Sequence, residues 1–175
     1  MEIRLAQVNE FEAIMAFYHQ MTEDLEDASE GPGWEKDVYP SPESVQTAII
    51  AQNLYVSTAG NDLIAAMILN HEYTDGYEQG NWQIEAQPEE LLFVHALGVS
   101  FDHQGKGLAK QLVDYMIEYA KLLNLKAIRL DVLWNNESAK QLYLTKGFKH
   151  IGTIELFYED TGLTNYDLYE YLLVV

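Results

Sequence analysis

The segment from Glu90 to Leu122 constrains the fold most, because it reads as a strand, a glycine-containing loop and a helix in that order. Residues Glu90 to Val99 are almost all apolar, which is typical of a central strand buried on both faces. From Leu108 to Leu122, apolar residues recur at three- and four-residue spacing, so one face of that helix is expected to be buried.

The loop contains two glycines, which let the backbone come close to a ligand. The helix that follows directs its unpaired N–H groups and the positive end of its dipole toward the same place. This arrangement predicts an anion site, and a pyrophosphate suits it well. The residues expected to form the site are Gln104, Gly105, Lys106, Gly107, Leu108 and Ala109.

Two cofactor classes use a strand, a glycine loop and a helix. A dinucleotide fold requires a third glycine, but Lys110 stands at that position. Asp131 imitates the acidic residue that would hold a ribose. However, no series of strands and helices follows the loop to build the second half of a dinucleotide fold. An NAD(P)-binding protein is therefore the weaker alternative.

A second motif lies about thirty residues downstream. Asn135 or Asn136 can cap a helix there, and Gly147 can end it in the left-handed conformation. The motif residues are Asn136, Ala139, Leu142, Tyr143, Gly147 and Phe148. Together with the loop, they resemble the GNAT superfamily of N-acetyltransferases, whose acetyl-CoA loop reads Q/R-x-x-G-x-G/A and whose later helix reads N-x-x-A-x-x-L-Y followed by G-F. The resemblance covers Leu91 to Gly152, about a third of the chain.

The remaining elements fit the same fold more loosely. We expect a strand within Met1 to Ala6, a helix capped by Asn9 with a stripe of Phe11, Ile14, Met15, Tyr18 and Met21, a helix from Ser41 and Pro42 to Ile50, a hairpin of Leu54 to Thr58 with Leu63 to Asn70, and strands at His150 to Tyr158 and Tyr166 to Val174. The resemblance implies one α/β (α+β) domain over residues 1–175, with a mixed central sheet of about six to seven strands flanked by helices. Its acetyl-CoA-binding core would be about 90–152 and its acceptor side about 1–89.

The resemblance also implies a direct attack of an amine on the acetyl thioester. The carbonyl oxygen needs N–H donors, which a bulge near Leu97, Gly98 and Val99 could supply. The departing thiolate benefits from a proton donor, and Tyr143 occupies the position of the tyrosine in the family motif. The helical face alone favours a core aromatic with a satisfied hydroxyl at Tyr143, and the two motifs together favour the catalytic role.

The base that removes the amine proton is less defined. His95 is chemically suitable, and strand alternation predicts that it shares a face with Phe93 and Leu97. It could also be a hydrogen-bonded core residue, and Glu90, Glu72 or a water chain are alternatives. Asn136 could cap a helix and could also form a hydrogen bond with the CoA arm, and these two roles are compatible with each other.

Charge is unevenly distributed. The formal charge is −18, and residues 1–105 hold two basic residues against nineteen carboxylates. Residues 106–149 hold eight basic residues against four acidic ones, so the basic segment coincides with the expected CoA site. Candidates for contact with its phosphates, unless they are ordinary surface lysines, are Lys106, Lys110, Lys140 and Lys146.

Acidity elsewhere argues against nucleic-acid binding and permits a cationic acceptor, which Glu23 to Glu30 could attract unless that segment only aids solubility. The insertion Glu72 to Glu89 could contact the acceptor, could contact a second copy in a homodimer, or could be a long loop without either role. No apolar run approaches the roughly 18 residues of a membrane helix, so we expect a cytoplasmic protein. The five histidines show no metal-ligand spacing, and the absence of cysteine excludes disulfides and a cysteine acyl-enzyme.

The resemblance therefore implies an N-acetyltransferase that moves acetyl from acetyl-CoA to a primary amine of a small molecule or peptide. A CoA-binding sensor or interaction module without transfer chemistry is the alternative, because the base is unidentified.

Overall fold

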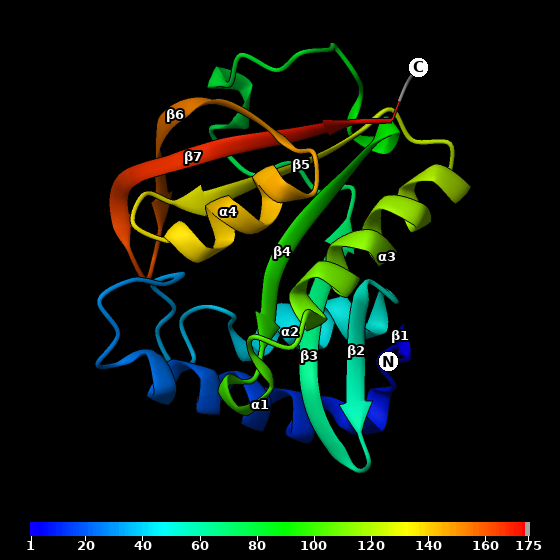
Figure 1. Cartoon of the computed structure of the whole chain (residues 1–175), viewed down its shortest axis with the longest axis vertical. Helices are drawn as coiled ribbons and strands as arrows, with labels where there is room; N and C mark the ends of the chain where they lie inside the picture. The colour runs from blue at the N-terminus through cyan, green and yellow to red at the C-terminus, as the bar shows by residue number, and fades with distance from the viewer. Residues whose placement is uncertain (174–175) are drawn as a thin grey trace.

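A computed structural model describes residues 1–173 as a seven-stranded sheet covered by helices (Figure 1). The strands are β1 (Ile3–Leu5), β2 (Leu54–Ala59), β3 (Asp62–Asn70), β4 (Leu91–Val99), β5 (Ala127–Leu133), β6 (Lys149–Tyr158) and β7 (Gly162–Leu172). The helices are α1 (Phe11–Leu25), α2 (Pro42–Ile50), α3 (Leu108–Leu122) and α4 (Glu137–Thr145), with short 3-10 helices η1 (Val8–Glu10), η2 (Tyr77–Gln79), η3 (Pro88–Glu90) and η4 (Phe101–His103).

The strand order is β1-β2-β3-β4-β5-β7-β6. Strands β4 and β5 run parallel, and the other neighbouring pairs are antiparallel. The predicted mixed sheet of about six to seven strands in a single α/β domain is confirmed. The strand predicted to end at Val174 is present as β7, although Val174 itself lies outside the described residues.

The two faces of the sheet carry separate cores. Helices α3 and α4 pack on one face, which we call the α3/α4 face, against β-strand residues such as Val94 and Leu130. On the opposite face, α1 and α2 pack against Ala66 and Ile68 of β3, and the segment 72–89 packs against Phe93 of β4. In Figure 1, α3 and α4 lie in front of the strands and α2 lies behind them.

The helix ends follow local signals with one exception. Ser41 caps α2 by accepting a hydrogen bond of 3.1 Å from the Ser44 N–H, and Asn136 rather than Asn135 caps α4. The prediction that Asn9 caps the first helix is wrong. Asn9 lies inside η1, where Gln7 and Glu10 form a capping box, and α1 starts one turn later.

The β-bulge of β4 lies at Ala96 and Leu97, slightly before the predicted position at the glycine. These two residues stand opposite the single residue Met67, whereas Gly98 pairs regularly with Ala66. Ala96 has a φ of 49°, a left-handed conformation that is costly for a residue with a side chain. Gly98 has a different role, because a Cβ at this position would lie 2.5 Å from the sulfur of Met21.

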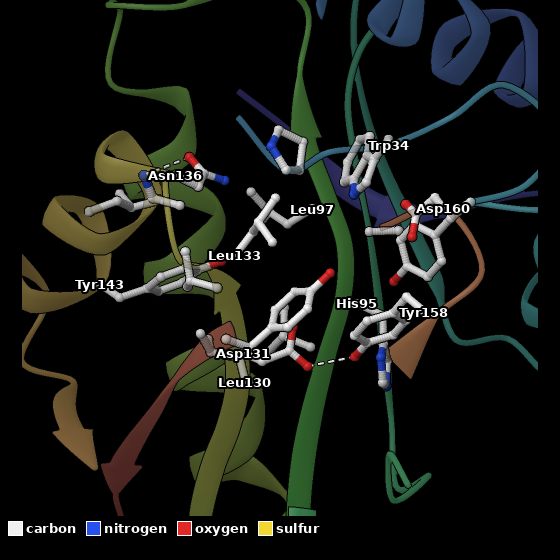
Figure 2. A pocket seen from close by; sticks show the side chains of 18 residues that line it. Trp34, His95, Leu97, Leu130, Asp131, Leu133, Asn136, Tyr143, Tyr158 and Asp160 are labelled. Carbon is white, nitrogen blue, oxygen red and sulfur yellow. Dashed lines mark hydrogen bonds between the residues drawn. The ribbon is translucent and has the colours of Figure 1, made fainter. Parts of the chain in front are cut away.

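The bulge changes which face each β4 side chain occupies. Phe93 packs on the α1/α2 side of the sheet, whereas Leu97 packs on the α3/α4 face. The prediction that Phe93, His95 and Leu97 share one face is therefore wrong for Leu97, because the extra residue inverts the alternation. Figure 2 shows His95 and Leu97 on opposite sides of β4.

None of the helices in residues 1–173 is long and apolar enough to cross a membrane.

Candidate active site

A cavity opens where β4 and β5 separate. The two strands pair only from Leu91 opposite Ala127 to Phe93 opposite Arg129, and then diverge (Figure 1). The cavity has a volume of about 120 Å³ and is lined by residues 94–97 of β4 and 130–133 of β5. Side chains from both faces of the sheet line it, so the cavity passes through the sheet. This gives it two halves with different chemistry.

The half on the α3/α4 face is mainly apolar and ends at Tyr143. Leu97, Ala139 and Leu142 form its walls, and Asn136 lies at its edge (Figure 2). The Tyr143 side chain is 6% exposed, and its hydroxyl has no hydrogen-bond partner within residues 1–173. Burial, and secondarily the charge of Asp131, raise the pKa of Tyr143, so the hydroxyl keeps its proton at neutral pH.

The opposite half contains a carboxylate, Asp131. Its Oδ2 accepts hydrogen bonds from the Tyr77 hydroxyl at 2.8 Å and the Tyr158 hydroxyl at 2.6 Å. Desolvation raises the pKa of Asp131, and these two hydrogen bonds partly oppose that effect. Asp131 forms no ion pair with any residue in the range 1–173.

A row of aromatic rings continues from Asp131 along this half of the cavity. The rings of Tyr166 and Tyr158 are 5.1 Å apart, those of Tyr158 and Tyr39 are 5.8 Å apart, and those of Tyr39 and Trp34 are 6.2 Å apart. Asp160, from the turn between β6 and β7, adds a second carboxylate beside them (Figure 2). Burial raises the pKa of Asp160, and the charges of Glu35 and Asp131 raise it further.

His95 also lines the cavity, on the side of Asp131. Its Nε2 lies 2.9 Å from Oδ1 of Asn70, which also accepts a hydrogen bond from the Glu72 N–H. An amide oxygen can only accept, so Nε2 carries the proton and Nδ1 has the lone pair. Desolvation lowers the pKa of His95 to about 4, which makes it neutral at pH 7 and a weak base.

The loop before α3 lies outside the cavity, beyond the end of β4. Gly105 and Gly107 have φ values of 73° and 80°, and a Cβ at either would meet no atom within 4 Å. Gly107 is the N-cap of α3, and no side chain caps this helix end. Gln104 fixes the loop to β4 through a hydrogen bond of 3.1 Å from Nε2 to the Val99 carbonyl. A ligand can therefore approach the backbone at the two glycines, beside a helix end that no side chain caps, and this arrangement suits an anion.

The candidate lysines differ in availability. Lys140 is ion-paired with Asp167 at 2.8 Å, and Lys146 is ion-paired with Asp114 at 2.6 Å, so both charges are already compensated within the chain. Lys106 donates a hydrogen bond to the Asp102 carbonyl. These contacts favour Lys106 and Lys110 over Lys140 and Lys146 as phosphate contacts.

The insertion 72–89 lies beside the half of the cavity that contains Asp131, because Tyr77 binds this carboxylate, although none of its residues lines the cavity. Besides supplying Tyr77, it is anchored to a buried ion pair between Arg129 and Glu170, 2.7 Å apart. Arg129 donates to the Ile84 carbonyl and stacks on the Trp82 ring at 4.5 Å, and Glu170 accepts from the Gln83 N–H. These contacts pack the insertion against the sheet as an integral part of the fold.

Of the sequence-derived candidates, the structure brings together His95, Leu97, Asn136 and Tyr143 around one cavity. The segment Glu23 to Glu30 does not line that cavity. The sequence reasoning missed Trp34, Tyr39, Tyr158 and Asp160, and treated Asp131 only as a ribose-like feature. The available signal for Asp131 was a carboxylate within the largely apolar strand β5, which also holds Arg129.

Comparison with known proteins identifies the family. The model described as the acetyltransferase (GNAT) family matches residues 16–148. The chain belongs to the GNAT family. The resemblance inferred from the two motifs is confirmed, and acetyl-CoA is the donor used by this family.

Two curated relatives show partial similarity to this GNAT chain. Streptothricin acetyltransferase from Escherichia coli is 33% identical over 78 residues, which are 45% of this chain and 44% of that protein. The N-alpha-acetyltransferase RimI from Mycobacterium tuberculosis is 28% identical over 75 residues, which are 43% of this chain and 46% of that protein. The chain thus spans less than half the length of these relatives, and their names indicate different acceptors.

Solved structures support the fold over the whole GNAT chain. A GNAT-family acetyltransferase from Streptococcus agalactiae 2603 has a TM-score of 0.81 at 21% identity, with 99% of this chain and 96% of that chain covered. The protein yncA from Salmonella typhimurium, solved with acetyl-CoA, has a TM-score of 0.71 at 17% identity, with 100% and 95% covered.

Proposed function

We propose that this GNAT protein transfers an acetyl group from acetyl-CoA directly to a primary amine. The observation that supports this most strongly is Tyr143, a buried residue at the cavity whose hydroxyl has no hydrogen-bond partner in residues 1–173 and whose pKa is raised by burial. The two halves of that cavity correspond to a donor side and an acceptor side.

On the donor side, we propose that the loop Gln104 to Ala109 binds the pyrophosphate of CoA. The open space above Gly105 and Gly107 and the uncapped start of α3 support this assignment. We assign the pantetheine arm to the apolar half near Leu97 and Asn136. The Asn136 Oδ1 accepts from the Ala139 N–H at 3.3 Å, which leaves the amide NH₂ free to donate.

Acetyl-CoA supplies a thioester carbonyl, to which the amine nitrogen forms a bond as the carbon–sulfur bond breaks. In our proposal, Tyr143 gives its proton to the departing sulfur, whose pKa as a free thiol is about 8.5. A tyrosine with a raised pKa is protonated before this step and takes a proton back from solvent afterwards. The bulge at Ala96 and Leu97 is our candidate source of backbone N–H donors to the carbonyl oxygen.

The amine must lose a proton before it attacks. His95 remains a candidate base, since its Nδ1 has a lone pair, although the lowered pKa limits the fraction of time it holds a proton. A chain of water molecules in the polar half is the alternative. We also propose that the acceptor side extends beyond residues 1–89, because Tyr158, Asp160 and Tyr166 line the same half.

The test is to incubate the protein with acetyl-CoA and a panel of amines, and to follow both free thiol and acetylated product. We expect thiol and acetyl-amine in equal amounts. Tight CoA binding without product from any amine would instead favour a CoA-binding sensor. Failure to bind CoA, together with a thermal shift by NAD, would favour a dinucleotide-binding protein.

A further inference from the structure

The acceptor half of the cavity holds two carboxylates that the chain does not neutralise. Neither Asp131 nor Asp160 forms an ion pair within residues 1–173. Their hydrogen-bond partners are neutral, namely the Tyr77 and Tyr158 hydroxyls for Asp131 and the Thr161 N–H for Asp160. Two partly desolvated negative charges that face one cavity are costly unless a ligand brings positive charge.

The walls between these carboxylates are aromatic. Tyr166, Tyr158, Tyr39 and Trp34 form a continuous row, with neighbouring ring centroids 5.1 to 6.2 Å apart. Aromatic faces attract cations and also cover the methylene groups of an alkyl amine. This half of the cavity therefore combines the two features that recognise an organic ammonium group.

An independent feature marks the cavity as a ligand site. The Tyr143 side chain is more than nine-tenths buried, and its hydroxyl, which lacks a hydrogen-bond partner in residues 1–173, points into the cavity (Figure 2). Asp131 and Tyr143 line the same cavity, so one ligand can contact both groups.

We infer that the acceptor is a small amine with a second, non-reacting ammonium group, with the reacting amine at Asp131 and the second cation between Asp160 and the aromatic row. This inference rests on the proposed acetyl transfer. The reacting nitrogen must become neutral before it attacks, so it cannot compensate a carboxylate throughout the reaction. A second ammonium group keeps its charge and can remain paired with Asp160.

The position of Asp160 fits the second cation. It lies in the turn that follows β6, and the negative charge of the exposed Glu35 acts on it. Asp131, in contrast, lies on the central strand β5. A linear diamine that entered past Glu35 and Asp160 would therefore present its leading amine to Asp131 and Tyr143.

The experiment compares α,ω-diamines of increasing length with amino alcohols of equal length, starting from 1,4-diaminobutane and 4-amino-1-butanol. We expect kcat/KM for the best diamine to exceed that of its amino alcohol by about tenfold or more, as for loss of one charge-assisted contact. Asp160→Asn should remove most of this preference without weakening CoA binding. The matched control is Asp62→Asn, at the exposed start of β3, which should keep the preference.

Binding is measured in parallel on the CoA-bound protein by calorimetry, so the inference does not depend on turnover. We expect each preferred diamine to bind more tightly than its amino alcohol, and Asp160→Asn to abolish the difference. Equal kcat/KM values for diamines and amino alcohols would overturn the inference while leaving the proposed acetyl transfer intact. Absence of any difference in binding would overturn it even if no amine were acetylated. Failure of CoA itself to bind would instead count against the proposed function.

Discussion

The Tyr77 hydroxyl donates a hydrogen bond of 2.8 Å to Oδ2 of Asp131, a residue 54 positions later in the chain. The same oxygen accepts from Tyr158 of β6 at 2.6 Å. The insertion 72–89 and the β6–β7 hairpin thus hold one carboxylate in place from two sides. Two segments that are far apart in the sequence therefore set the position of the carboxylate in this half of the cavity.

Replacement of Tyr143 by Phe should keep CoA affinity and lower turnover by roughly a hundredfold or more, the usual contribution of a positioned acid. The ring contact with Phe148, with centroids 5.3 Å apart, is retained, so the fold should be unaffected. Steady-state kinetics and CoA calorimetry give the two values. Tyr115→Phe, on α3 and outside the cavity, is the control, and equal turnover in both variants would remove Tyr143 from the mechanism.

Gly107→Ala should lower CoA affinity about tenfold or more, which corresponds to about 1.4 kcal/mol. The new methyl group meets no protein atom, but it occupies the space proposed for the pyrophosphate and strains a φ of 80°. Gly60→Ala, with a φ of 62° and similarly open surroundings at the β2–β3 turn, separates these two effects. Both variants should lose about 1–2 kcal/mol of stability, and only Gly107→Ala should bind CoA more weakly.

Asp131→Asn should change how stability depends on pH. The pKa of Asp131 is raised in the folded state, so this state binds the proton more tightly than the unfolded chain does. Stability from this group is therefore greatest at low pH and is lost as pH rises from about 3.9 through the raised pKa. The amide oxygen can still accept from Tyr77 and Tyr158 in the variant. Urea unfolding at several pH values should show that wild type loses stability relative to the variant across this window. Parallel curves would show that Asp131 has an ordinary pKa.

His95→Gln should remove a pH dependence of opposite sign. The folded-state pKa of His95 is lowered to about 4, so the unfolded chain binds the proton more tightly between pH about 4 and 6.5. Wild type should therefore lose about 1.4 kcal/mol of stability per pH unit as pH falls through this range. His71→Gln, at an exposed position after β3, serves as the control. NMR titration of the His95 ring checks the pKa directly, and a value near 6.5 would contradict the prediction.

Arg129→Met should destabilise the protein by about 3–5 kcal/mol, because it leaves Glu170 buried without its partner. Replacement of both Arg129 and Glu170 by Met should cost much less than the sum of the two single changes. Urea unfolding of the three variants completes the double-mutant cycle. Additive losses would mean that Arg129 and Glu170 stabilise the fold independently.

Local signals in the sequence were enough to predict most helices and strands, and to select four residues that line the cavity, namely His95, Leu97, Asn136 and Tyr143. Helix periodicity, the Ser41 cap and the glycine before α3 act over a few residues, so one segment contains the whole signal. The bulge was misplaced because Gly98 matches the local pattern of a bulge, whereas its actual constraint is Met21, 77 residues earlier in the chain.

The half of the cavity around Asp131 could not be predicted in the same way. Trp34, Asp131 and Tyr158 lie on three separate segments of the chain that meet only after the sheet has formed, and none belongs to a short motif. The pKa of His95 likewise depends on burial, which the strand pattern suggests but does not measure.

The short pairing of β4 with β5 has a mechanical consequence. Three residue pairs form the seam between a four-stranded and a three-stranded half of the sheet. A ligand bound in the gap would contact both halves of the sheet and would restrain their motion relative to each other. Amide hydrogen exchange along β4 and β5 should therefore slow when CoA is bound, and the protein would be at its stiffest when both substrates are in place.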